Sequence, residues 1–125
     1  MKKRIKIFLG VWLASVSLSV FPHAIMTSSQ PAKEATLAKG PEKVQVCFNE
    51  IVGEQFRALA VITAKGKRMD NKDMSESGVD EHSCFTSTVK HLKEGKYYVR
   101  YRAESADGHI VTGKYTFYVG EINDE

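Results

Sequence analysis

Apolar and polar side chains alternate along much of the chain after residue 43. Such a period of two indicates β-strands with one buried face. In residues 44–50 the apolar side chains Val44, Val46 and Phe48 alternate with Gln45, Cys47 and Asn49. Three further runs are also interpreted as strands, at residues 85–89, 97–102 and 113–119. Residues 58–64 are almost continuously apolar, which predicts a strand buried on both sides.

Polar segments that contain Gly or Pro separate these strands and predict turns. Residues 65–81 are interpreted as a loop, or as a hairpin with a long tip, and residues 27–43 as an extended edge strand followed by a loop. Two shorter segments, 93–96 and 106–109, have the composition of turns. Short strands, Gly-containing turns and no convincing amphipathic helix predict an all-β fold, a single antiparallel β-sandwich.

The start of the chain has the pattern of a secretory signal peptide. Four basic residues lie within the first six positions, and the largely apolar, uncharged run 7–21 follows them. A membrane anchor needs about 18 strongly apolar residues, and several serines and Pro22 interrupt this run. We therefore expect a signal peptide at 1–22, a β-sandwich domain at 23–120, an acidic tail at 121–125 and a periplasmic location, with an uncleaved anchor as the alternative.

The basic character of the full chain belongs mostly to that signal. Four of the 18 Lys and Arg residues precede residue 23, so 14 remain against 15 Asp and Glu. The mature chain has no overall attraction for nucleic acid or anionic lipid, and we expect no nucleic-acid partner. Its 103 residues suffice for one domain with one modest core.

Candidate chemistry lies in the segment Ser105-Ala106-Asp107-Gly108-His109, which precedes Gly113. A carboxylate and an imidazole two residues apart on a turn can offer one oxygen and one nitrogen donor to a divalent metal. Taken alone, the segment fits a solvated hairpin tip better, because Asp and Gly are common turn residues.

The surrounding sequence resembles the CopC family of periplasmic copper-binding proteins. Residues 98–117 match that family's order of strand, Ser-x-Asp-x-His, x-x-x-Gly and strand. His23-Ala24, Ser28-Ser29, Pro31-Ala32 and the strand at 44–50 resemble the family in the same order. The resemblance covers essentially the whole mature chain and implies an immunoglobulin-like Greek-key topology.

The resemblance also implies a Cu(II) site at the mature N-terminus. The free amine and imidazole of His23 would chelate the metal, and Asp107 and His109 would complete the site. Glu50 would be a further ligand or a hydrogen-bond partner of the ligands, although a solvated residue at a strand end is the alternative. Such nitrogen and oxygen donors suit Cu(II). Pro22 precedes His23, whereas signal peptidase favours a small residue there, so cleavage elsewhere would leave His23 as an ordinary side chain or remove it.

Other residues differ from the family pattern or carry no metal chemistry. Some members bind Cu(I) through a Met-rich loop, but only Met69, Met74 and His82 occur in the corresponding region. A thioether site needs several soft ligands together, so we interpret both methionines as loop residues. Tyr101 replaces the family's Trp and is expected in the core. His91 is expected on the surface.

These features predict a copper-binding protein and not an enzyme. Its partners would be the copper ion and an inner-membrane CopD-like or soluble copper protein, and we expect a monomer. A metal-free periplasmic sandwich is the alternative. A third hypothesis, a histidine-brace copper oxidase, fits less well because the mature chain is short and lacks tryptophan.

The two cysteines predict a disulfide, because exported proteins fold in an oxidising compartment. Alternation places Cys47 on the opposite face of its strand from Val46 and Phe48, and Cys84 opposite Phe85. In the topology that the resemblance implies, these strands are neighbours, so the two sulfurs could meet outside the core. Thiolate ligation of copper is the alternative.

Overall fold

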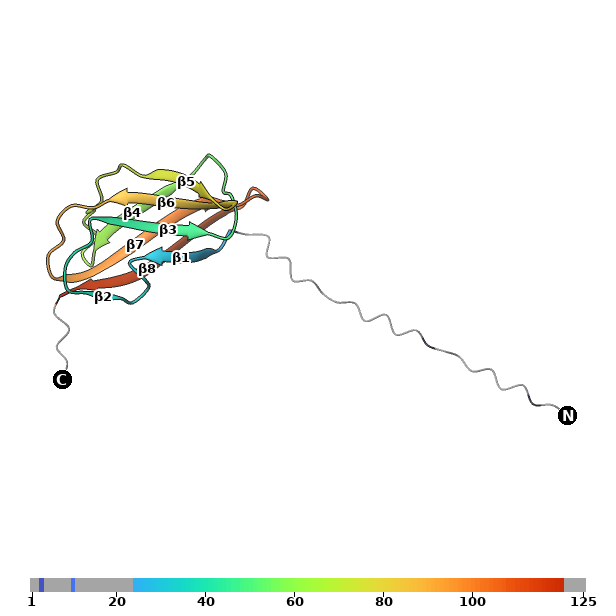
Figure 1. The fold of residues 1–125 in the computed structure, drawn as a ribbon, viewed down its shortest axis with the longest axis horizontal. Coiled ribbons are helices and arrows are strands. Elements are labelled where there is room, and N and C mark those ends of the chain that lie inside the picture. Colours follow the sequence, from blue (N-terminus) through green and yellow to red (C-terminus); the bar gives the residue numbers. More distant parts are fainter. Residues whose placement is uncertain (1–2, 4–9, 11–23, 121–125) are drawn as a thin grey trace.

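The computed structural model describes Lys3, Gly10 and residues 24–120. Nearly all of the predicted signal peptide, and the predicted tail at 121–125, lie outside these residues. Eight strands form the fold (Figure 1): β1 (Met26–Gln30), β2 (Thr36–Leu37), β3 (Lys43–Phe48), β4 (Ala58–Thr63), β5 (Ser75–Val79), β6 (His82–Thr88), β7 (Gly95–Glu104) and β8 (Ile110–Val119). The described part of the chain contains no helix long and apolar enough to cross a membrane.

The strands form two four-stranded sheets that pack face to face. One sheet has the order β1-β3-β6-β5 and the other β2-β8-β7-β4. Every pairing is antiparallel except that of the two-residue strand β2, which runs parallel to β8. The predicted all-β sandwich is therefore confirmed, with one short parallel pair at the edge of the second sheet.

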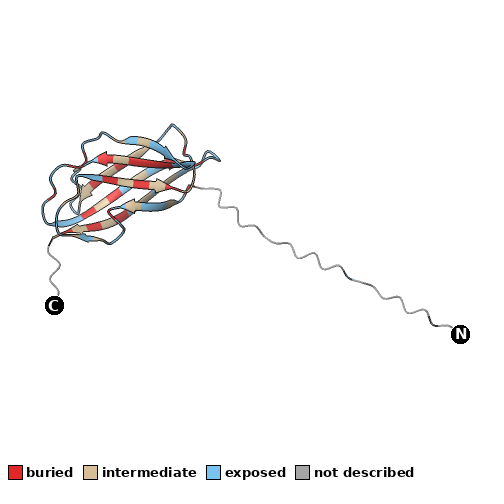
Figure 2. Cartoon of the chain, in the orientation of Figure 1, coloured by how far each residue is buried: buried red, intermediate tan, exposed pale blue. Residues whose placement is uncertain are grey.

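The core lies between the two sheets and consists of the inward half of each alternating strand. Val44, Val46 and Phe48 of β3 are fully buried, as their period predicted, and Phe85 of β6 lies beside them. The Phe48 and Phe85 rings meet edge to face with centroids 5.1 Å apart. Buried and less buried positions alternate along the strands (Figure 2), which is the pattern of one core face per sheet.

Two expectations about strands are wrong. In β4 only Leu59 and Val61 are buried, whereas the alternate positions are half-buried, because the outer face of this sheet is open. Small alanines made the run look more buried than it is. The polar segment 65–81 contains β5, which pairs with β6 through the tight turn at Asp80 and Glu81. Its sequence, Ser-Glu-Ser-Gly-Val, has no apolar alternation because β5 is a largely exposed edge strand.

Tyr101 of β7 points between the sheets and packs against the core as expected, although it is only half-buried. Its ring meets Phe48 edge to face, with centroids 5.5 Å apart. The ring lies across Gly113, its direct partner on β8. A Cβ on Gly113 would lie 2.7 Å from Cε1 of Tyr101 and closer still to Cζ and the hydroxyl. Gly113 is therefore required by the space that Tyr101 occupies.

We expect Gly113→Ala to lower the free energy of unfolding by about 2 kcal/mol, because the ring of Tyr101 must move to admit the methyl group. Gly78→Ala in β5 is the matched control, since its Cβ would be 3.8 Å from the nearest atom, Cδ1 of Ile51. Urea unfolding of both variants measures the difference. Equal stabilities of the two variants would contradict this explanation of Gly113.

Candidate metal site

The turn between β7 and β8 holds two of the predicted ligands. The backbone N–H of Ser105 donates to the carbonyl of His109 over 2.8 Å, and that of Gly108 donates to the carbonyl of Ser105 over 2.9 Å. Gly108 has a φ of 87°, a conformation that glycine adopts without strain. Ser105 is buried. The turn is therefore a closed, hydrogen-bonded unit at the end of the longest hairpin.

Asp107 and His109 are brought together on this turn. Nδ1 of His109 lies 2.7 Å from Oδ2 of Asp107, and the backbone N–H of His109 donates to Oδ1 over 3.2 Å. The Ser105 hydroxyl also donates to Oδ1. This hydroxyl is the largest influence on the Asp107 carboxyl and, with His109, outweighs a partial desolvation, so the pKa lies well below its usual range. Asp107 is thus an anion at neutral pH, and it orients the His109 ring.

Glu50 supports the turn from the other sheet. Its Oε1 accepts a hydrogen bond of 2.9 Å from the backbone N–H of Ala106, next to Asp107. Its own carbonyl accepts one of 3.1 Å from Ser83 N–H in β6. Glu50 was expected to be either a further metal ligand or a hydrogen-bond partner that positions the ligands. The hydrogen bond to Ala106 fits the second role.

The beginning of β1 lies at the same end of the sandwich. Ile25 N–H donates to Oδ1 of Asn49 over 2.8 Å, and Asn49 N–H donates to the carbonyl of Ile25 over 2.9 Å. Ala24 is buried. Because Asn49 precedes Glu50, this contact fixes the N-terminal end of the domain beside the β7–β8 turn. His23 lies outside the described residues, so its role stays a prediction.

The described residues alone do not complete a metal site. Within residues 24–120 no group of three or more His, Cys, Asp and Glu side chains is arranged to hold a metal ion. Met69 and Met74 lie outside the strands, as expected, and pack against the core. His82 directs Nδ1 to the carbonyl of Phe48 at 3.1 Å. Asp107 and His109 are therefore a donor pair that needs a further ligand.

The predicted disulfide is present between β3 and β6. Cys47 and Cys84 are direct partners in the antiparallel register and are bonded, with Cα atoms 4.0 Å apart. Both cysteines of the chain are consumed, so the alternative of thiolate ligation does not hold in this structure. The bond joins β3 and β6 one residue before Phe48, at the end of the sheet that carries Glu50.

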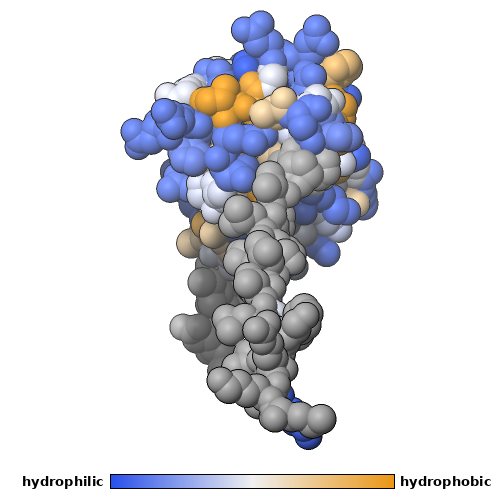
Figure 3. Space-filling model, turned by 90° about the vertical axis from the view of Figure 1, so that its right-hand side faces the viewer, coloured by the Kyte–Doolittle hydropathy of each residue, from blue (hydrophilic) through white to orange (hydrophobic). Residues whose placement is uncertain are grey.

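Exposed apolar side chains surround this end of the molecule, which the sequence alone did not indicate. Ile25 is bonded to Asn49 through its backbone, Ile51 follows Glu50 and Ile110 follows His109, and all three are more than 40% exposed. Figure 3 looks at this end and shows apolar residues grouped among hydrophilic ones.

Ser105 donates its hydroxyl to Asp107. The sequence indicated a role for Ser105 only as part of the Ser-x-Asp-x-His pattern.

Fold and site define a two-sheet β-sandwich with a carboxylate–imidazole pair on a hairpin turn. The CopC domain matches residues 26–120, and the chain belongs to the CopC family. The chain is 33% identical over 118 residues to copper transport protein CutJ of Bacillus subtilis, which covers 94% of this chain and 22% of CutJ. It is 30% identical over 119 residues to copper resistance protein C of Escherichia coli, and this match covers 90% of this chain and 94% of that protein.

A solved structure agrees with this assignment. The crystal structure of CopC from Methylosinus trichosporium OB3b superposes with a TM-score of 0.67 at 27% identity and covers 82% of this chain and 99% of that one. The chain thus spans nearly all of the CopC structure but only about a fifth of CutJ.

Proposed function

We propose that this chain binds one Cu(II) ion beside the β7–β8 turn and sequesters the ion or passes it to another copper protein. The observation that carries the proposal is the pair of Asp107 and His109, held 2.7 Å apart on a hydrogen-bonded turn next to the start of β1. Membership of a family whose relatives are named for copper transport and copper resistance identifies the metal as copper.

The proposed ligands are the amine and imidazole of His23, with Asp107 and His109. Ala24, the residue after His23, is buried, and the next residue, Ile25, is hydrogen-bonded to Asn49. The neighbour of Asn49, Glu50, is hydrogen-bonded to the turn. An amine, two imidazoles and a carboxylate are the tetragonal nitrogen and oxygen set that Cu(II) prefers. Glu50 acts in this proposal by holding the turn in place, and its loss would displace both Asp107 and His109.

The same proposal places the protein in the bacterial periplasm. Residues 1–22 are the export signal, 23–120 the copper-binding domain and 121–125 an acidic tail. The bond between Cys47 and Cys84 supports an oxidising compartment, because disulfides persist there and are rare in the cytosol.

Binding and exchange, and not catalysis, are the proposed activity of a monomer. The partner would be an inner-membrane CopD-like or a soluble copper protein. The match to 22% of a copper transport protein supports this view, since there a domain of this kind is part of a larger transport protein.

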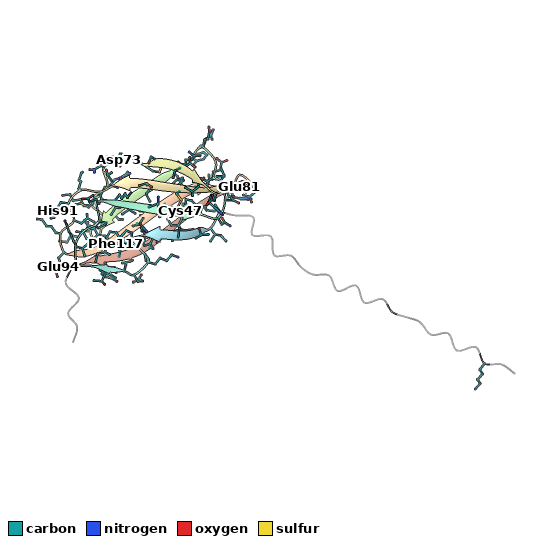
Figure 4. All side chains as sticks on the ribbon, viewed as in Figure 1. Cys47, Asp73, Glu81, His91, Glu94 and Phe117 are labelled. Carbon is teal, nitrogen blue, oxygen red and sulfur yellow. A yellow bond between two sulfur atoms is a disulfide. The ribbon has the colours of Figure 1, made fainter. Side chains whose placement is uncertain are left out.

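The test is Cu(II) titration of the exported protein against a competing chelator. His109→Ala is expected to weaken Cu(II) binding by at least about tenfold, because loss of even an indirect partner of a metal site commonly costs that much. His91→Ala is the matched control: His91 is also exposed, and Figure 4 places it at the end of the sandwich opposite Glu81, whereas the β7–β8 turn lies at the Glu81 end (Figure 1).

Mass measurement of the N-terminus accompanies the titration, because the proposed amine ligand requires that the mature chain begin at His23. A protein that begins elsewhere would support the metal-free alternative. Equal affinities of His109→Ala and His91→Ala would remove His109 from the site.

A further inference from the structure

The outer face of the β2-β8-β7-β4 sheet concentrates positive charge. Tyr97, Val99, Tyr101 and Ala103 of β7 face the core, so the residues that alternate with them face outward. These include Arg100 and Arg102. Their neighbours in β4 are Ala60 and Ala58, and their neighbours in β8 are Lys114 and Thr112. Two adjacent rows across three strands therefore contain three cations and no carboxylate.

This face is hollowed. A shallow depression of about 830 Å³ lies over the three strands. Its floor is formed by small or apolar side chains of β4, and its other walls by basic and aromatic ones: Ala58, Ala60, Ile62, Arg68, Tyr98, Arg100, Arg102 and Lys114. Not one Asp or Glu lines it. A cavity of this size is within the range of ligand sites, although it is open along the sheet.

Several of the cations are held in position by other groups. Arg68 makes a two-pronged contact with the buried Asp70, with Nε 2.9 Å from Oδ1 and Nη2 3.0 Å from Oδ2. The Nε–H of Arg102 donates to the carbonyl of Phe56 over 2.8 Å. The ammonium of Lys114 lies 4.8 Å from the centre of the Tyr98 ring. Such fixed donors lose little entropy when an anion binds.

The arrangement costs stability in the free protein. Arg100 and Lys114 are direct cross-strand partners, and like charges in that position repel each other. Within residues 24–120 no carboxylate forms an ion pair with Arg100, Arg102 or Lys114. The mature chain as a whole has 14 basic and 15 acidic residues, four of the 18 basic ones preceding residue 23. Arg100, Arg102 and Lys114 are thus gathered on one face, and no carboxylate of residues 24–120 forms an ion pair with them.

We propose that this hollow is a docking site for an acidic, extended segment of a partner protein. Carboxylates of such a segment would pair with Arg100, Arg102 and Lys114, and its small or apolar side chains would lie on Ala58 and Ala60. A flat lipid surface fits less well, because the face is concave. None of the exposed large hydrophobic residues, Ile25, Ile51, Phe56, Val79 and Ile110, lines the hollow to enter a bilayer.

The experiment measures binding of a fluorescent peptide of roughly 12 residues that alternates glutamate with alanine, by anisotropy. The wild-type protein is expected to bind it, with affinity that falls steeply between about 20 mM and about 200 mM salt. Arg100→Glu with Lys114→Glu should lower the affinity by about tenfold or more. Lys43→Glu with Lys90→Glu make the same charge change at exposed positions, the first residue of β3 and the second residue after β6, and should alter the affinity less than about twofold.

Further measurements separate the alternatives. Arg100→Glu alone turns a repulsive cross-strand pair into an attractive one, so it should reduce peptide binding without lowering the melting temperature. His109→Ala should leave peptide binding unchanged, so the result is independent of copper binding. The proposal is overturned if the wild type does not bind the peptide at low salt or if both double variants weaken binding equally. It is also overturned if only vesicles of equal parts phosphatidylcholine and phosphatidylglycerol bind the face.

Discussion

Replacing both Cys47 and Cys84 with alanine is expected to lower the free energy of unfolding by about 3 kcal/mol. The disulfide links residues 37 positions apart, and chain-entropy estimates for loops between about 15 and 100 residues run from about 3 to about 4.7 kcal/mol. The bridge restrains the unfolded chain, whereas the β3–β6 register is held in the folded protein by backbone hydrogen bonds. Urea unfolding followed by circular dichroism measures the change.

Wild-type protein treated with reductant is the control for this double variant. If the disulfide itself is responsible, the reduced wild type and the double alanine variant should unfold at nearly the same urea concentration. A loss of less than about 1 kcal/mol in the variant would contradict the expected contribution of the disulfide.

Asp70→Ala is expected to cost about 3 kcal/mol, because it removes the acceptor for a buried donor and breaks an ion pair. Asp70 is 1% exposed, and its Oδ1 accepts a hydrogen bond of 3.0 Å from the Val61 N–H in β4. Its Oδ2 accepts one of 3.2 Å from Lys72 N–H. Unpaired buried donors cost about 1–3 kcal/mol, and broken buried ion pairs about 3–5 kcal/mol. Arg68 is half-exposed and can turn to water, which limits the loss.

This contribution should depend on pH. Desolvation is the largest single influence on Asp70 and would raise its pKa, but Arg68 and the N–H groups of Val61 and Lys72 together outweigh it and lower the pKa. A lowered pKa stabilises the fold above the unfolded value of about 4, and the stabilisation is lost as pH falls through the folded value. The difference between wild type and Asp70→Ala should therefore shrink below about pH 4.

The exposed Asp73→Ala is the control for the Asp70 variant. Asp73 accepts hydrogen bonds of 2.9 Å from Thr88 N–H and from the Ser87 hydroxyl, and a third from the Thr88 hydroxyl, but its carboxylate is exposed to water. Its loss should cost less than about 2 kcal/mol, because water can replace an exposed acceptor. If both variants were equally stable, or if the effect of Asp70→Ala were the same at neutral and acidic pH, the importance assigned to the buried carboxylate would be wrong.

The strands could be predicted where one face is buried, and only there. The alternating residues Val44, Val46 and Phe48 predict β3, because burial of one face requires an apolar side chain at every second position. β5 is joined to β6 by backbone hydrogen bonds. Its side chains are mostly exposed and polar, so the sequence shows no alternating pattern that would predict this strand. The burial of Asp70 could not be predicted either, because its hydrogen bonds to the N–H groups of Val61 and Lys72 form only in the folded chain.

For the site, the turn residues were predictable and their supports were not. Asp107 and His109 are two residues apart, so their proximity follows from the local turn. The hydrogen bond from Ala106 to Glu50 joins residues 56 positions apart and depends on the packing of the two sheets. The cationic hollow likewise arises because register sets Arg100 beside Lys114.

Electron paramagnetic resonance of the copper-loaded protein that begins at His23 tests the proposed site most directly. One tetragonal Cu(II) species with mixed nitrogen and oxygen ligation is expected, and His109→Ala should remove an imidazole nitrogen from its spectrum. The same spectrum in the wild type and in His109→Ala, or the spectrum of aqueous copper in both, would contradict the site formed by His23, Asp107 and His109.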